Sequence, residues 1–171
     1  MIFEHRKSDG TMNTDAFRAA ILEGLPLRMR WMIGDMSWAW DFSRARQELR
    51  PLNDADVVGM TVPPEWSDYL IFGEQDFSDG GGASPYVVVH AGSGKIHWLD
   101  VESEASPISL FNSSLSHFVE TFRLFELTLR QQAIYVWELQ RQASLIDPES
   151  FGASEWRLAV ETMIEELKSN T

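Results

Sequence analysis

The sequence predicts an α+β fold, in which a small antiparallel β-sheet of three or more strands packs against N-terminal and C-terminal helices. Two observations support this prediction. Short runs rich in β-branched and aromatic residues cluster in the middle of the chain, and segments with helical periodicity precede and follow them. Strands that are consecutive in sequence pair through short turns, and helices that follow in a run cover one face of the sheet that results.

Length and composition indicate a single domain spanning residues 1–171. Hydrophobic residues make up 44% of the chain and charged residues 23%, which is typical of a globular protein. The absence of cysteine excludes disulfides and thiolate metal sites, and it agrees with a reducing compartment. No apolar run approaches the ~20 residues needed to span a bilayer, so we expect a cytoplasmic protein.

The N-terminal part predicts a helix followed by a strand. Residues 1–11 are polar and are expected to be flexible. Asn13 or Thr14 supplies a side-chain cap for a helix over 15–24, because either oxygen can accept a hydrogen bond from a free amide of the first turn. Apolar and polar residues alternate over 27–33, as in a half-buried strand, whereas the pattern over 38–49 is closer to a helix.

The middle of the chain predicts a three-stranded meander over 68–73, 85–90 and 95–101. The first strand is expected to stop at Gly73. A glycine-containing link of four residues, 91–94, joins the second and third strands and favours a tight antiparallel hairpin.

The C-terminal part predicts helices packed on this sheet. One begins at Asn112 or Ser113, and the periodicity over 114–143 fits either one long helix or two helices broken near Leu129. Ser154 is positioned to cap a final helix. We also expect Trp98 and Phe118 to be buried close together, since one closes the hairpin and the other begins the helix above it.

Three motifs in this region follow one another in a fixed order. They are Asp79-Gly80-Gly81-Gly82, the segment Gly94-Lys95-Ile96-His97-Trp98-Leu99-Asp100, and Phe111-Asn112-Ser113-Ser114-Leu115 with Phe118. Over residues 68–129 the chain resembles the SUKH superfamily of bacterial immunity proteins. The resemblance implies an α+β fold, no cofactor and no enzymatic activity. It also implies a protein that binds and neutralises a cognate toxin domain, often a nuclease or a nucleic-acid deaminase.

Negative charge is concentrated in the same region. The net charge is −12, and residues 68–107 contribute seven acids and one lysine, or −6. This charge disfavours binding to phosphate backbones and to anionic lipid, and it complements a basic protein. Most acidic runs are simply solvated surface. The predicted partner-binding residues are Glu74, Asp76, Asp79, Asp100, Glu102 and Glu104.

Several short patterns suggest other chemistry but lack a required residue. The string 92–95, Gly-Ser-Gly-Lys, has Val89 and Ile96 where a phosphate-binding loop needs a glycine and a hydroxyl residue. His90 and His97 share a face of the hairpin and one register pairs them, yet a metal centre needs a third ligand. The serines beside His117 fit a helix cap better than a nucleophile.

Two other functions are open on the sequence alone. The chain could serve as a general regulatory or scaffolding interaction module of the same fold. It could also bind a small molecule or metal through His90, His97 and the glycine-rich loop.

Overall fold

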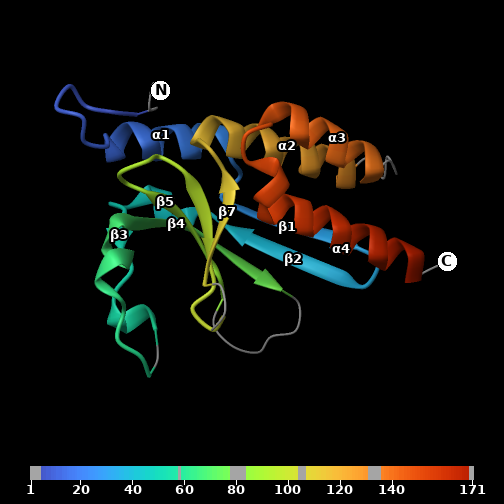
Figure 1. Ribbon diagram of the computed structural model, residues 1–171, viewed down its shortest axis with the longest axis horizontal. Helices are drawn as coiled ribbons and strands as arrows, with labels where there is room; N and C mark the ends of the chain where they lie inside the picture. Colours follow the sequence, from blue (N-terminus) through green and yellow to red (C-terminus); the bar gives the residue numbers. More distant parts are fainter. Residues whose placement is uncertain (1–4, 58, 78–83, 104–106, 131–135, 170–171) are drawn as a thin grey trace.

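An antiparallel seven-stranded sheet forms the centre of the molecule (Figure 1). The computed structural model describes residues 5–57, 59–77, 84–103, 107–130 and 136–169. Neighbouring strands follow the order β1-β2-β4-β5-β6-β7, and β3 pairs with β4. The strands are β1 (Arg28–Ile33), β2 (Met36–Asp41), β3 (Arg50–Pro51), β4 (Tyr69–Phe77), β5 (Tyr86–His90), β6 (Ile96–Leu99) and β7 (Ile108–Asn112).

Helices from both ends of the chain lie against one face of this sheet, which confirms the α+β prediction. They are α1 (Thr14–Gly24), α2 (Leu115–Arg130), α3 (Val136–Ile146) and α4 (Glu155–Ser169). Figure 1 shows β3 and its neighbouring helical turns on the other side. These 3-10 turns are η2 (Asp54–Asp56) and η3 (Pro64–Asp68), while η1 (Ser43–Arg46) follows β2 and η4 (Phe151–Ala153) precedes α4.

The predicted N-terminal helix forms as α1. Asn13 is its cap, with Oδ1 accepting a hydrogen bond from the amide of Ala16 at 3.1 Å. Its buried residues, Phe17 and Ile21, are one turn apart and face the core. Ahead of it the chain makes a turn closed by a β-bridge between Arg6 and Met12; the flexibility of residues 1–11 stays a prediction.

The prediction of a helix over 38–49 is wrong. Residues 36–41 instead form β2, which pairs with both β1 and β4. Trp38 and Trp40 are buried on the helix-covered face, while Ala39 and Asp41 alternate with them on the other face. This period of two is a strand pattern, and the charged residues that follow in η1 obscured it.

The prediction that the first meander strand stops at Gly73 is also wrong, because β4 continues to Phe77. Gly73 marks a register shift in the pairing with β5 rather than an end. A Cβ atom there would lie 2.6 Å from the ring of Phe42, so the glycine lets an aromatic ring pack directly on the strand.

Around the first C-terminal helix, the sequence placed the boundary too early and missed a strand. Residues 108–112 form β7, the edge strand next to β6. The helix then begins at Leu115, where Ser114 Oγ accepts a hydrogen bond from the amide of His117 at 3.2 Å. The helical region consists of α2 and α3, and the residues between them lie outside the described part of the chain. Ser154 caps α4 as predicted, accepting from the amide of Trp156 at 3.1 Å.

Aromatic side chains dominate the core between helices and sheet. Trp156 of α4 lies 4.5 Å from Phe125 and 5.6 Å from Phe118, measured between ring centroids, and Phe118 also contacts Phe111 of β7. A smaller cluster on the other face joins Trp66 of η3 to the outer residues of β4, β5 and β6. The sheet is therefore covered on both faces at its centre.

We expect Phe118→Ala to destabilise the protein by about 3–5 kcal/mol, because the ring is fully buried among other aromatic rings and its removal leaves a cavity. Equilibrium unfolding in urea measures this loss. Leu127→Ala is the matched control on the same helix, since its side chain is 55% exposed. Equal effects of the two substitutions would show that α2 is not docked through Phe118.

Candidate partner-binding surface

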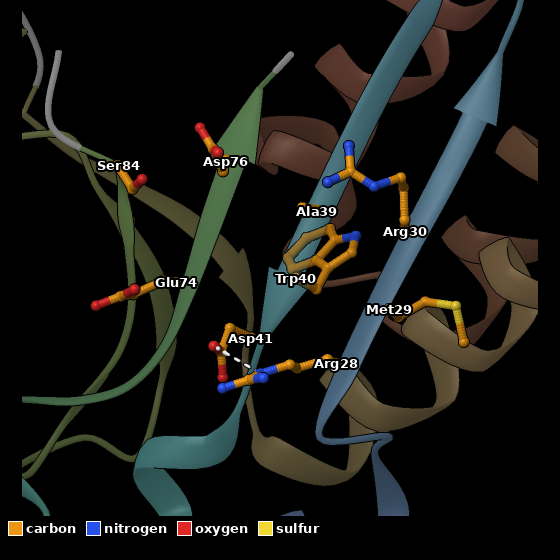
Figure 2. A pocket seen from close by; sticks show the side chains of 9 residues that line it. All are labelled: Arg28, Met29, Arg30, Ala39, Trp40, Asp41, Glu74, Asp76 and Ser84. Atoms are coloured by element: carbon orange, nitrogen blue, oxygen red, sulfur yellow. Dashed lines mark hydrogen bonds and ion pairs between the residues drawn. The ribbon is translucent and has the colours of Figure 1, made fainter. Parts of the chain in front are cut away.

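Two of the predicted partner-binding residues, Glu74 and Asp76, project from β4 on the face away from the helices. Figure 2 shows both beside a hollow of about 430 Å³, with Arg28 and Arg30 projecting from β1 on its other side. Gln75, between the two acids, turns to the helix-covered face and accepts a hydrogen bond from Trp98 Nε1 at 2.9 Å. The alternation of β4 thus separates the acids from the core.

Positive groups offset part of the negative charge in this hollow. Arg44 of η1 donates to Glu74 Oε1 from Nε at 3.0 Å, and its guanidinium also lies over the ring of Tyr86. Arg28 pairs with Asp41 at 3.3 Å. Glu74 is therefore an ion-paired, half-buried residue, whereas Asp76 is exposed to solvent.

Asp100 and Glu102 lie in the turn after β6, at the same end of the sheet as Asp76. The strand register explains this, because Tyr86 pairs with Glu74 on one side and with Leu99 on the other. Glu102 donates its amide to Asp100 Oδ1 at 3.0 Å, which holds the turn together. Asp79 and Glu104 lie outside the described residues.

Glu155, the first residue of α4, is an acid at this end of the molecule that the sequence did not single out. Burial raises the pKa of its carboxyl, and a hydrogen bond from Ser109 partly offsets that increase. The negative charge of Asp100 raises the pKa further. Asp100 therefore acts on the helix side of the sheet, while Asp76 faces the opposite side. We refer to Asp76, Asp100, Glu102 and Glu155 as the acidic end.

His90 and His97 share one face of the sheet, as predicted, but they are not cross-strand partners. His97 pairs with Val88, and Tyr69 lies edge-on to both imidazole rings. Burial lowers the pKa of His97 to about 4, so its ring is neutral at physiological pH. Within the described ranges, no group of three or more His, Asp or Glu side chains is arranged to hold a metal ion.

Ser113 and His117 meet the carboxylate of Asp147 in a polar cluster at the start of α2. Ser113 Oγ lies 2.9 Å from His117 Nδ1 and donates to Asp147 Oδ1 at 3.0 Å. Asp147 Oδ2 is 3.7 Å from the same histidine nitrogen. In a serine hydrolase the nucleophile and the orienting acid use different ring nitrogens, and here both approach Nδ1.

The same aspartate anchors a larger buried network. Asp147 Oδ2 accepts hydrogen bonds from Asn112 Nδ2 at 3.0 Å and from the amide of Ser113 at 2.8 Å. Asn112 in turn accepts from Trp156 Nε1 at 2.6 Å. This network joins β7 to α2, to the end of α3 and to α4. Asn112, which the sequence offered as a helix start, therefore has a structural role.

Comparison with known protein families identifies the family to which this chain belongs. A model described as SUKH-4 immunity protein matches residues 24–162. The chain belongs to the SUKH-4 immunity protein family. Neither the curated proteins nor the solved structures gave a match.

The SUKH-4 match covers β1 through the first half of α4, and so includes the acidic end, the hollow and the buried network. This family assignment confirms the resemblance that the motifs of residues 79–118 indicated. Across the described residues, no helix is long and apolar enough to cross a membrane.

We expect Asp147→Asn to lower the free energy of unfolding by about 1.5–3 kcal/mol at neutral pH, because the new amide group faces donors that need an acceptor. Burial alone would raise the pKa of Asp147, but hydrogen bonds from Ser113 and Asn112 among others outweigh it and hold the pKa below its ordinary value of 3.8. The ionised form therefore stabilises the fold above pH 3.8, and this contribution disappears as the pH falls through the lowered pKa.

Urea unfolding of both proteins between pH 7 and pH 2 measures this difference. The two stabilities should converge as the pH falls below 3.8. A gap that stays constant with pH would show that the charge of Asp147 contributes nothing.

Proposed function

We propose that this SUKH-4 protein is an immunity protein that binds and neutralises a cognate toxin domain in the bacterial cytoplasm. The observation that carries the proposal is the family match over residues 24–162. The function is binding rather than catalysis. In support, the serine, histidine and aspartate that lie together form a network with two groups at one ring nitrogen, which serves packing rather than proton relay.

The proposed toxin is basic and acts on nucleic acid, as a nuclease or deaminase. A cleft that holds nucleic acid must be positively charged to bind phosphates, and an acidic inhibitor complements it. The net charge of −12 and the acidic end support this pairing. Of the acids that the sequence pointed to, Asp76, Asp100 and Glu102 are the main proposed contacts, and Glu74 is secondary because Arg44 already pairs with it.

Affinity capture from the native cell with this chain as bait, followed by expression of the captured protein, tests the proposal. We expect the captured protein alone to arrest growth of a test strain and co-expression of this chain to restore growth. If no captured protein is toxic, or if co-expression leaves the arrest unchanged, the immunity function is wrong.

Reversing three charges of the acidic end should slow association with the toxin. We expect Asp76→Lys, Asp100→Lys and Glu102→Lys together to lower the association rate about tenfold or more at low salt, and the difference to shrink as salt rises. Stopped-flow or biosensor kinetics at two ionic strengths measure this, with circular dichroism checking the fold.

The matched control reverses three exposed acids at the other end of β4, in Glu48→Lys, Glu65→Lys and Asp68→Lys. Both variants carry the same net charge, so a general effect of charge would slow them equally. Equal rates for the two variants would place the toxin elsewhere on the surface.

A further inference from the structure

A second concavity, of about 190 Å³, lies between α4 and the helix-covered face of the sheet. Trp38 of β2, Trp98 of β6 and Trp156 of α4 contribute to its walls, and Leu158 stands at its rim with 45% of its surface exposed. The prediction that Trp98 is buried like Phe118 is wrong: Trp98 is only partly buried, because its ring lines this groove, whereas Phe118 is fully buried in the core. The groove has room for one long side chain.

Among the described residues that line this aromatic groove, one carries a charge, and it is the acid Glu155. Glu155 begins α4 at one end of the groove and receives a hydrogen bond from Ser109 of the neighbouring β7. Asp100 lies close enough for its charge to act on Glu155. The groove therefore combines one partly exposed aromatic ring, that of Trp98, with a half-buried carboxylate, in a region where further negative charge is near.

We propose that this groove binds one arginine side chain of the partner protein, with the guanidinium held between the ring of Trp98 and the carboxylate of Glu155. The identity of the partner as the toxin rests on the proposed function. Glu155 belongs both to the lining of the groove and to the acidic end, so an arginine bound there belongs to the same contact surface as Asp100 and Glu102.

Charge complementarity selects a cation, and the aromatic walls select arginine over lysine. A guanidinium stacks on indole faces and is more weakly hydrated than an ammonium group, so it loses less on entering a half-buried site. It also forms paired hydrogen bonds with a carboxylate. Arginine and tryptophan are both enriched among the residues that carry most of the energy of protein interfaces. A bound cation would also relieve the electrostatic cost that Glu155 bears beside Asp100.

Binding of a small probe to the isolated chain tests the groove without any toxin. N-acetyl-argininamide is titrated to millimolar concentrations against ¹⁵N-labelled protein, and the indole N–H signal of Trp98, assigned with Trp98→Phe, is followed by NMR. The citrulline analogue has nearly the same shape without the charge. We expect a saturable shift of the Trp98 signal with the arginine probe and a shift at least about fivefold smaller with citrulline.

Two substitutions on α4 separate the groove from general charge. Glu155→Gln keeps the size of the side chain and should weaken the arginine probe about tenfold. Glu165→Gln removes the same charge from an exposed position outside the groove and should leave binding unchanged. The dispersion of the other indole signals shows whether each variant is folded.

The proposal is overturned if the Trp98 signal does not move, if both probes move it equally, or if the two Gln variants bind alike. Because this titration contains no toxin, these outcomes leave the immunity function intact. Conversely, suppose that the arginine probe binds specifically but co-expression does not restore growth. The toxin would then be ruled out as the partner, and the groove would remain an arginine-binding site.

Discussion

The buried hydrogen bonds that connect Asn112, Asp147 and Trp156 hold the three C-terminal helices against the edge of the sheet. A carboxylate buried this deeply is costly unless donors surround it, and here the end of β7 supplies them. The same asparagine accepts from the indole of α4. One short stretch of chain therefore fixes the end of α3, the start of α2 and the start of α4 relative to the edge of the sheet.

The surface proposed to bind the toxin depends on this constraint. Trp156 is fully buried in the aromatic core and follows Glu155 directly, so the network that holds the indole also places the carboxylate beside Ser109. With α4 held at this position, its first turns and Trp98 form the two walls of the aromatic groove. The way β6, β7 and α4 meet therefore brings together Asp100, Glu102 and Glu155, while β4 supplies Asp76.

The sequence predicted the fold class, the central hairpin, the caps at Asn13 and Ser154 and the family, because each depends on local patterns. It failed where pairing and packing with other strands decide the outcome. β2 lies between its neighbour β1 and the distant β4, β7 pairs with β6 across an intervening turn, and Gly73 continues a strand because Phe42 packs against it. For the same reason the sequence could group acids by position but could not foresee that Arg44 pairs with one of them, or that Glu155 joins the others.

Hydrogen–deuterium exchange of the backbone amides, with and without the captured toxin, tests most directly whether the acidic end is the binding surface. If the acidic end binds the toxin, exchange should be slower in the complex for residues 96–103 and for the first two turns of α4, with no change in α1 or in the η2 and η3 turns. Protection confined to residues 43–68 or to α1, with the acidic end exchanging as in the free protein, would show that the toxin binds elsewhere.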